Sequence, residues 1–467
     1  MVPDTIGGFT PGDVLHRGGM AVLREATHPD HPGPLLLKLP LVAEGDDPAA
    51  IVGFEMEQMI MPRLSGPHVP HCFGVGYEPL PWIAMERIEG ASLLPLLDTL
   101  PRPAGEVAEI GAAIADALDS LHRQGVVHLD IKPANIVRRP DGAVVLVDFG
   151  VSHHAQLPDL LAEEFHLPYG SAPYMAPEQV IGVRGDPASD VFALGAIMYH
   201  LATGRTPFGD PQHLRAMKRR LWWDPPPPRA RQPDCPPWLQ EVILRCMEVA
   251  PQRRYGSAAH LAFDLRHADH VALTARAGRT RRDPWTARIR RRFHPDHQQS
   301  LVRAVAAPHE NAPIVVVALD LDTMSEGLTT SLRRVVRNVL ATIPGARVAC
   351  VNVLRTRRVL PDAGLDDAGR NKHVQLLIAL RHWSASLNLP EQRLTHHVLE
   401  ALNPAEALLD YASHNRVDHI ILGARADGIG RRLLGSVAAE VARDAPCSVT
   451  VVRQRGHGSD RRAAEAN

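Results

Sequence analysis

The last third of the chain alternates short apolar runs with longer amphipathic stretches. The apolar runs are IVVVALD (314–320), ARVACVNVL (346–354), DHIILG (418–423) and CSVTVVR (447–453). Stretches of helical composition, such as TTSLRRVVRNVLATI and PAEALLDYASHNR, separate them. Nearly continuous apolar strands that alternate with helices are typical of a parallel sheet with both faces covered. The pattern predicts an α/β parallel-sheet domain over residues 312–454, followed by a disordered tail at 455–467.

The part before residue 270 shows a different order, with strand-like runs early and helical runs later in a segment rich in proline and glycine. A chain of 467 residues exceeds one ordinary core, so two domains with a connection are expected. We assign the first domain to residues 8–270. Residues 276–292 then hold eight arginines against the single acid Asp283. Like-charge repulsion opposes compaction there and predicts a basic linker or a solvated helix over residues 271–311.

Composition narrows the class of protein. Hydrophobic residues form 45% of the chain and charged residues 22%, which is typical of globular proteins. The net charge of −1 disfavours a general nucleic-acid-binding protein, although contact of the arginine-rich run with nucleic acid stays open. The five cysteines are scattered without metal-ligand spacing, which favours free thiols in a reducing compartment. No apolar run reaches about 18 residues and no secretory pattern opens the chain, so we expect a cytoplasmic protein without membrane contact.

The stretch VHLDIKPANIV (127–137) places Asp130, Lys132 and Asn135 inside an otherwise apolar run. Transfer of a phosphoryl group to a hydroxyl needs a carboxylate to accept the proton, cations to neutralise phosphate oxygens, and oxygen ligands for Mg²⁺. Asp130 could be that base, Lys132 could contact the γ-phosphate and Asn135 could hold the metal ion. A polar loop with an Asx turn would account for the same residues. This stretch alone leaves both interpretations open.

Two further motifs follow in order. VVLVDFG ends a short apolar strand with DFG beginning at Asp148, and GSAPYMAPEQ contains APE ending at Glu178. Together with the stretch above, they resemble the catalytic loop, the DFG motif and the APE motif of eukaryotic-like protein kinases. GGMA, DIKPAN and YMAPE resemble the bacterial serine/threonine type. The resemblance implies an α+β bilobal protein kinase fold, protein substrates, and transfer of the ATP γ-phosphate to protein hydroxyls with Mg²⁺ or Mn²⁺.

The resemblance also implies roles for single residues. Asp130 and Lys132 are expected to be catalytic, and Asn135 and Asp148 to bind the metal ion. A glycine-rich loop, a strand lysine with its helix glutamate, and the hinge backbone are expected to bind ATP. These ATP-binding residues are Leu15, Gly18, Gly19, Leu23, Lys38, Glu57, Glu86 and Ile88. Residues expected to position the structure or the substrate are Ser171, Glu178, Asp190 and Arg254.

Several positions depart from the kinase pattern. His16 stands where the first glycine of the loop is expected, Ala21 stands at the third, and Leu36 replaces a small alanine above the adenine. Pro62 lies inside the helix expected at FEMEQMIMPRL, so this helix should kink or end near Met61. These departures keep open a catalytically weak pseudokinase that acts as a nucleotide-binding signalling scaffold. GSAPYMAPE, the peptide-positioning segment, disfavours a kinase of small molecules.

Leu129 stands where the family usually has an arginine before the catalytic aspartate. That arginine needs an anionic partner, often a phosphorylated residue of the activation loop. The corresponding loop, residues 151–175, has no threonine, and its serines are Ser152 and Ser171. We therefore expect a kinase of the non-RD type, which lacks this arginine and does not need loop phosphorylation for activity.

Residues 312–454 resemble the universal stress protein domain, an α/β fold that often dimerises and sometimes binds ATP. The residues that match its nucleotide site are Asp320, Gly423, Gly435 and Ser436. In nucleotide-binding members a glycine-rich loop leads into a helix whose N-terminus takes the phosphates. Ala426 replaces the second glycine here, and the spacing from it to Gly435 is one residue shorter than usual. A second nucleotide site and a sensory, partner-docking or homodimerising role therefore both stay open.

Overall fold

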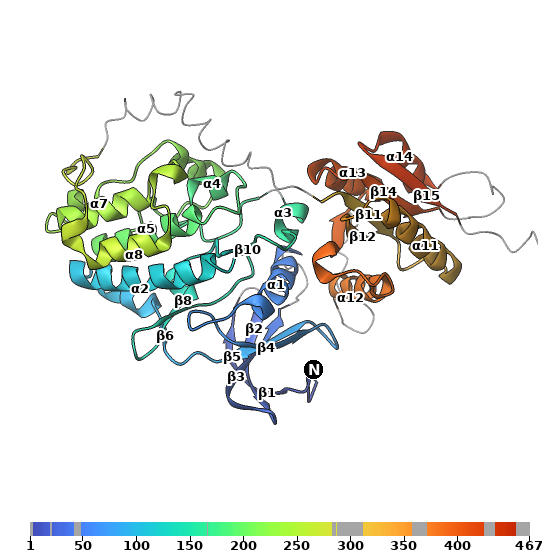
Figure 1. Cartoon of the computed structure of the whole chain (residues 1–467), viewed down its shortest axis with the longest axis horizontal. Coiled ribbons are helices and arrows are strands. Elements are labelled where there is room, and N and C mark those ends of the chain that lie inside the picture. The colour runs from blue at the N-terminus through green and yellow to red at the C-terminus, as the bar shows by residue number, and fades with distance from the viewer. Residues whose placement is uncertain are drawn as a thin grey trace, which may run out of the picture. The chain divides into compact units, whose positions relative to one another are not determined.

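The computed structural model describes residues 3–18, 21–41, 48–165, 167–282, 286, 312–356, 371–424 and 435–453. These residues form two compact units, one made by the residues up to 286 and the other by those from 312 onward (Figure 1). Each unit has a hydrophobic core of its own. Within the described ranges, no helix combines the length and the apolar character needed to cross a membrane.

An antiparallel sheet opens the first unit, with the strand order β1-β2-β3-β5-β4. Its strands are β1 (Thr10–Arg17), β2 (Ala21–His28), β3 (His31–Pro40), β4 (Cys72–Gly76) and β5 (Trp82–Glu86). Lys38 lies in the central strand, between β2 and β5. Leu35, Leu37 and Leu39 belong to a hydrophobic cluster on one face of the sheet. Because side chains alternate along a strand, Lys38 points to the other face.

Helix α1 (Pro48–Ile60) packs against β3 of this sheet. A single 3₁₀ turn, Met61–Arg63, follows the helix directly. Pro62 has no backbone N–H to donate, and its ring excludes a further α-helical turn. The prediction that the helix ends near Met61 is confirmed.

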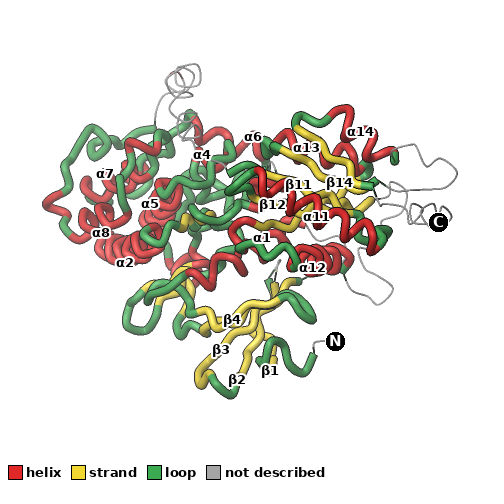
Figure 2. The backbone as a smooth tube through the Cα atoms, turned by 45° about the vertical axis from the view of Figure 1, so that its right-hand side comes forward, coloured by secondary structure: helices red, strands yellow, loops and turns green. Residues whose placement is uncertain are grey.

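Helices make up most of the second lobe of this unit, and Figure 2 shows them gathered apart from the antiparallel sheet. The longer helices are α2 (Ala104–His122), α5 (Ala188–Thr203), α7 (Pro237–Cys246) and α8 (Ala258–Arg266). The shorter ones are α3 (Leu160–Glu164), α4 (Pro177–Val180) and α6 (Leu214–Met217). Helix α5 packs against both α2 and α7 and is buried along nearly its whole length. A helix that is apolar all round lies at the centre of a bundle, and α5 has that position here.

Two small sheets fix the loops that carry the sequence motifs. One consists of β6 (Ala91–Ser92), β8 (Ile136–Arg138) and β9 (Val144–Leu146), and in the other β7 (Val126–Val127) pairs with β10 (His153–His154). The stretch that contains Asp130 runs from β7 to β8, and Asp148 follows β9 closely. Both motifs therefore adjoin paired strands, which fix the position of their backbone. The bilobal α+β kinase fold that the resemblance implies is confirmed.

Residues 271–282 pack on and next to α7, whereas the sequence predicts a linker from residue 271 onward. Arg276 lies 2.9 Å from Glu241 and 2.8 Å from Glu248. A backbone N–H and a hydroxyl of the same segment also donate to Glu241, which is 2% exposed. The acids that neutralise Arg276 lie 35 and 28 residues earlier in the chain, so a local count of charge could not find them. Most of the remaining predicted linker lies outside the described residues.

A parallel sheet forms the centre of the second unit, with the strand order β13-β12-β11-β14-β15. Its strands are β11 (Ile314–Leu319), β12 (Arg347–Arg355), β13 (Leu394–Ala401), β14 (His419–Gly423) and β15 (Ser448–Val452). The helices around it are α11 (Glu326–Thr342), α12 (Lys372–Ala385), α13 (Pro404–His414) and α14 (Ser436–Asp444). Ile314 and Val316 share a core with α13 and α14, while the alternate residues Val315 and Val317 are buried on the other face. The prediction of an α/β parallel sheet is confirmed.

Strand β13 is the one that the apolar pattern missed. Its sequence LTHHVLEA has two histidines in the middle, so no continuous apolar run marks it. His396 Nε2 lies 2.8 Å from the Ser384 hydroxyl, and burial lowers the pKa of His396 well below its ordinary value. A neutral imidazole with a hydrogen-bond partner can take a buried strand position that a charged one could not.

Candidate active site

A buried carboxylate from α5 holds the loop that contains Asp130. Asp190 Oδ1 accepts the N–H of Leu129 at 2.8 Å, and Oδ2 accepts the N–H of His128 at 2.8 Å. His122 Nε2 also lies 2.9 Å from Oδ2. Leu129 has a φ of 65°, in the left-handed region that leucine rarely adopts. The charge-assisted hydrogen bonds that Asp190 accepts from these N–H groups offset the cost of this backbone conformation.

The carboxylate of Asp130 is bonded from three directions. Its Oδ1 accepts the backbone N–H of Ser171 at 2.7 Å. Its Oδ2 accepts from Lys132 Nζ at 2.7 Å and from Asn135 Nδ2 at 3.1 Å. Asp130 is 8% exposed, so its oxygens have fixed directions beside a cation. Such a carboxylate can accept a proton from a hydroxyl group that reaches it.

Lys38 lies between two carboxylates. Its Nζ is 2.5 Å from Glu57 Oε2 on α1 and 3.0 Å from Asp148 Oδ1. Burial disfavours the charged ammonium, but the carboxylates of Asp148 and Glu57 outweigh it and raise the pKa of Lys38 above its ordinary value. The Lys38 ammonium lowers the pKa of Asp148 to about 2, whereas burial raises the pKa of Glu57. A fixed, charged ammonium therefore stands where β3, α1 and the DFG segment meet.

Asn135 and Asp148 carry oxygens that could hold a metal ion. The N–H of Val147 donates to the carbonyl of Asn135 at 3.0 Å, which keeps the two residues adjacent. Asn135 uses Nδ2 for Asp130, and Asp148 uses Oδ1 for Lys38. Asn135 Oδ1 and Asp148 Oδ2 can therefore take a ligand. An amide oxygen and a carboxylate oxygen suit Mg²⁺, which completes its octahedron with water and phosphate oxygens. In the described ranges, no cluster of three or more His, Cys, Asp or Glu side chains offers another metal site.

The glycine-rich loop joins β1 to β2. The N–H of Gly18 donates to the carbonyl of Ala21 at 3.0 Å and closes the turn, while Gly19 lies outside the described residues. Leu15 on β1 is 42% exposed. Leu23 lies on β2, one strand away. The loop therefore has an apolar side chain on each of its two strands.

The two hinge residues predicted from the sequence differ in whether their backbone N–H group already has a hydrogen-bond partner. The N–H of Glu86 donates to the carbonyl of His71 at 2.8 Å, and Glu86 Oε1 accepts from Arg139 at 2.7 Å. The N–H of Ile88 has no hydrogen-bond partner within the described part of the chain. Ile88 is therefore the residue whose amide is available to a ligand.

A second ion pair lies deep in the helical lobe. Arg254 Nη1 is 2.6 Å from Glu178 Oε1, Nη2 is 2.7 Å from Oε2, and both side chains are fully buried. The Ser189 hydroxyl donates to Glu178 Oε1 at 2.7 Å, and Arg254 donates to the carbonyl of Ala188 at 2.8 Å. The pair therefore ties the APE segment to the start of α5 and has no surface that a ligand could reach.

Comparison with known families agrees with this geometry. Residues 18–265 match the protein kinase domain. The chain belongs to the protein kinase family. Residues 312–453 match the universal stress protein family. A kinase domain and a universal stress protein domain thus follow one another in a single chain.

Several bacterial kinases are similar to the kinase domain. The serine/threonine-protein kinase PknB of Mycobacterium leprae is 31% identical over 260 residues, which are 54% of this chain and 42% of that protein. The serine/threonine-protein kinase Pkn1 of Myxococcus xanthus is 38% identical over 209 residues, which are 43% of this chain and 30% of that protein. The chain therefore spans less than half the length of these relatives. The crystal structure of the PknI kinase domain of Mycobacterium tuberculosis is 28% identical, covers 56% of this chain and 97% of its own, and has a TM-score of 0.45.

Two residues that hold the catalytic loop were not found from the sequence. Gln179, next to the APE motif, donates through Nε2 to the Leu129 carbonyl at 2.8 Å and accepts the N–H of Ala176 at 2.8 Å. The hydroxyl of Ser152 donates to the His128 carbonyl at 3.0 Å and is fully buried. In the sequence, each of these residues is only a polar residue next to a motif, and its spacing does not indicate which backbone group it binds.

The candidate residues of the universal stress protein domain lie toward one edge of its sheet. Asp320 follows β11, and Gly423 ends β14. These parallel strands are neighbours, so their carboxyl ends share an edge, where ligands bind in open α/β sheets. Gly435 is the N-cap of α14, and Ser436 is its first residue. The loop 425–434 lies outside the described residues.

Gly423 has a packing role of its own. A Cβ atom at this position would lie 2.8 Å from the side chain of Leu328 on α11. The close approach of α11 to β14 therefore explains why a glycine is needed here, and no bound ligand is required for that explanation. Ala426, which departs from the glycine pattern, lies outside the described residues.

Proposed function

We propose that this protein is an ATP-dependent serine/threonine kinase that transfers the γ-phosphate of ATP to hydroxyl groups of proteins. The observation that carries the proposal is the Asp130 carboxylate, which Ser171, Lys132 and Asn135 bond from three directions. The bacterial relatives named above are serine/threonine-protein kinases, which supports the same reaction.

In the proposed reaction the substrate oxygen forms a bond to the γ-phosphorus, and the bond from that phosphorus to the β–γ bridging oxygen breaks. Asp130 accepts the proton of the substrate hydroxyl. Lys132, 2.7 Å from Asp130, lies where it can neutralise charge on the transferred group. Lys38, fixed by Glu57, binds the α- and β-phosphates.

The remaining contacts concern the metal ion and the nucleotide. A divalent ion, Mg²⁺ or Mn²⁺, neutralises charge on the phosphate oxygens when it is bound. Asn135 and Asp148 would hold it through the oxygens that their own hydrogen bonds leave available. The hinge carbonyl of Glu86 and the N–H of Ile88 bind the adenine. The nucleotide contacts of the glycine-rich loop are Leu15, Gly18, Gly19 and Leu23.

An inactive scaffold was the rival function, and nothing in the described residues favours it. Lys38 is joined to Glu57 and Asp148, and Asp130 is joined to Asn135. A protein that only binds nucleotide or partners has no need of this whole set. The geometry thus supports turnover.

We infer that the kinase is of the non-RD type and does not need loop phosphorylation. Leu129 is 3% exposed, and its backbone is held by Asp190 and Gln179. Neither of these partners requires a phosphate group. The loop serine Ser152 is fully buried, which makes it a poor phosphorylation site.

For the universal stress protein domain we infer a sensory or dimerising role. The shared sheet edge of Asp320 and Gly423, together with the helix N-terminus at Gly435, supports a ligand there. ATP is one such ligand, and a homodimer through this domain is the alternative. All five cysteines are free, which supports a reducing compartment such as the cytoplasm.

Asp130→Asn tests the proposed reaction. We expect phosphate transfer to fall about 10²–10⁴-fold, because the proton acceptor is lost. Transfer of label from γ-labelled ATP to the chain itself and to a general protein substrate measures this, and calorimetry should show unchanged ATP affinity. Asp98→Asn, at an exposed aspartate of the same lobe, is the matched control. Equal transfer by wild type and Asp130→Asn, or none by wild type, would contradict the proposal.

A further inference from the structure

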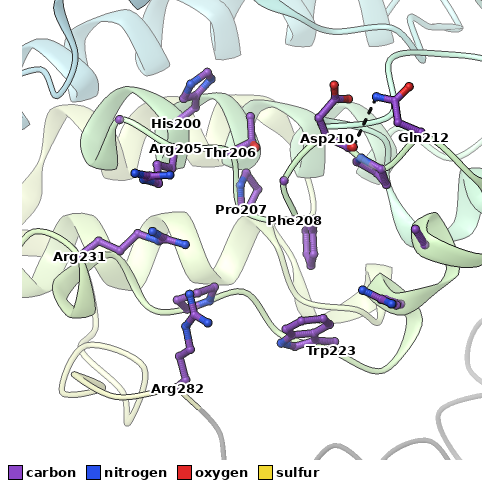
Figure 3. Close-up of a pocket in the computed structure, with 16 residues that line it drawn as sticks. His200, Arg205, Thr206, Pro207, Phe208, Asp210, Gln212, Trp223, Arg231 and Arg282 are labelled. Atoms are coloured by element: carbon purple, nitrogen blue, oxygen red, sulfur yellow. Dashed lines mark hydrogen bonds between the residues drawn. The ribbon is translucent and has the colours of Figure 1, made fainter.

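The helical lobe contains a cavity of about 680 Å³ that the kinase motifs do not account for. It lies beside the C-terminal end of α5, and the loop 205–212, α6, the segment 223–231 and the side chains of Arg219 and Arg282 form the rest of its wall. Figure 3 shows the rings of Phe208 and Trp223 and several arginine side chains around the same space. None of the proposed ATP or metal contacts lines it.

The wall of this cavity is strongly basic. Among the described residues, the charged side chains that line it are Arg205, Arg219, Arg231, Arg282 and Asp210. None of the four arginines forms an ion pair with an acidic residue in the described ranges. Arg231 donates to the neutral hydroxyl of Tyr199 at 3.0 Å. By contrast, Arg254 and Arg276 of the same lobe each face a carboxylate. Among the described residues of the wall, the positive charges therefore outnumber the negative ones by four to one.

The cavity adjoins the segment that would position a peptide substrate. His200, in its wall, lies 3.0 Å from the Tyr174 hydroxyl through Nδ1, and burial lowers the pKa of His200. Burial thus disfavours a charge on this imidazole, and the permanent positive charge of the wall comes from the arginines. Tyr174 also donates its N–H to the carbonyl of Ser171, whose own N–H binds Asp130. Three consecutive hydrogen bonds thus connect His200 in the cavity wall to Asp130 of the catalytic loop.

Arg220 makes a second connection between the cavity and this segment. Its guanidinium donates to the carbonyls of Ala172 and Met175 and lies 5.0 Å from the centre of the Phe208 ring, which lines the cavity. Arg220 is 1% exposed, and burial lowers its pKa to about 10. It therefore fixes the wall and does not offer its charge to a ligand.

We propose that this cavity binds an acidic side chain, a carboxylate or a phosphorylated hydroxyl, of the peptide that the kinase phosphorylates. The proposal rests on the function given above. Guanidinium groups bind carboxylates and phosphates through paired N–H donors, and among the described residues of the wall four arginines outnumber the one acid, Asp210. A nucleic acid would need a row of phosphate contacts along a surface, whereas these arginines surround one cavity beside the peptide-positioning segment.

The test measures binding of labelled peptides to the full-length chain by fluorescence polarisation. A neutral peptide with one serine is the reference, and a single glutamate, or a phosphoserine, is moved through the positions on either side. We expect at least one position to tighten binding about tenfold, the size of a charge-assisted hydrogen bond. Glutamine at that position should lose the gain.

Variants locate the effect in the cavity. Arg205 and Arg219 are both exposed, so Arg205→Gln with Arg219→Gln should fold normally. This double variant should lose the preference for the acidic peptide and keep the affinity for the neutral one. Arg253→Gln, at an exposed arginine outside the cavity, should keep the preference.

Each contrary outcome is distinct. No preference at any position, or a preference that the double variant retains, would overturn the proposal. Binding of inorganic phosphate or of a short oligonucleotide to the arginines as tightly as the acidic peptide would also overturn it.

Measurement of turnover separates this proposal from the proposed kinase reaction. A charge preference in binding without phosphate transfer would contradict the reaction alone. Phosphate transfer with equal kcat/KM and equal affinity for acidic and neutral peptides would contradict the cavity proposal alone.

Discussion

The helical lobe of the kinase domain and the sheet of the universal stress protein domain bury different kinds of side chain. In the helical lobe, Glu178, Asp190 and Arg254 are at most 3% exposed, and each has charged or backbone partners. In the other domain, the central strands bury residues such as Val316 and Ile420 in an apolar core. The helical lobe adds buried charges with defined hydrogen-bond directions to its apolar core, whereas the other domain packs mainly by shape and volume, with hydrogen-bonded polar groups such as His396 at single positions.

This difference bears on how function can be inferred. A buried charge is costly unless it is paired, so every buried acid or base of the helical lobe implies a partner at a fixed place. Apolar strands imply only that they are covered, because the hydrophobic effect has no direction. The buried charges of the kinase domain therefore indicate which residues are paired, whereas the apolar core of the universal stress protein domain indicates only the fold.

Removing Arg254 should have the largest effect on stability. Arg254→Met leaves Glu178 as a buried, unpaired carboxylate, which costs about 3–5 kcal/mol. Urea unfolding followed by circular dichroism should show the loss in the transition of the kinase domain.

The double variant Glu178→Leu with Arg254→Met is the control for this prediction. It removes both charges, so we expect it to be more stable than Arg254→Met alone. If Arg254→Met unfolds at the same urea concentration as wild type, the polar core is not what specifies the helical lobe.

The residues that we predict for the kinase site stand mostly in short motifs, and the structure brings several of them together. Asp130, Lys132 and Asn135 lie within six residues of one another, and their mutual bonds follow from local geometry. The bond from Gln179 to Leu129 spans 50 residues, and no local pattern indicates such a partner. The positive φ of Leu129 also depends on distant hydrogen bonds.

The other domain shows a different limit of the sequence. Its apolar runs predicted four of the strands, but β13 stayed hidden because His396 and His397 interrupt its pattern. Ser384 on α12 is the hydrogen-bond partner that allows His396 to be buried, and the sequence pattern does not show that the two residues are in contact. The local charge count at 271–282 has the same limit, because the acids that neutralise Arg276 lie on and just after α7.

A smaller effect should follow from a methyl group at Gly423. The added Cβ atom would lie 2.8 Å from the flexible end of Leu328, so α11 or this side chain must shift. We expect Gly423→Ala to cost about 1 kcal/mol, at the low end of overpacking. Hydrogen exchange measured by mass spectrometry on peptides from β11 and β14 would report it.

Gly435→Ser provides the contrast in the same domain. No atom lies within 4 Å of a Cβ built at Gly435, and serine is a favoured N-cap residue. Exchange in β14 should therefore stay as in wild type. If Gly423→Ala and Gly435→Ser gave the same exchange rates in β14, close packing of Gly423 against Leu328 would not be what stabilises this part of the sheet.

Phosphatase treatment should have the smallest effect. Asp190 and Gln179 hold the backbone of Leu129, and Ser171 reaches Asp130 through its backbone N–H, so none of these contacts involves a phosphate group. We expect the initial rate of peptide phosphorylation to change by less than about twofold. Ser171→Ala, which keeps that N–H, should preserve the contact to Asp130.

Loss of most of the activity after phosphatase treatment, with recovery on incubation with ATP, would mean that the activation loop does contain a phosphorylation switch. If the rate holds, the contacts that fix Asp130 and Leu129 form without a phosphate group on the activation loop.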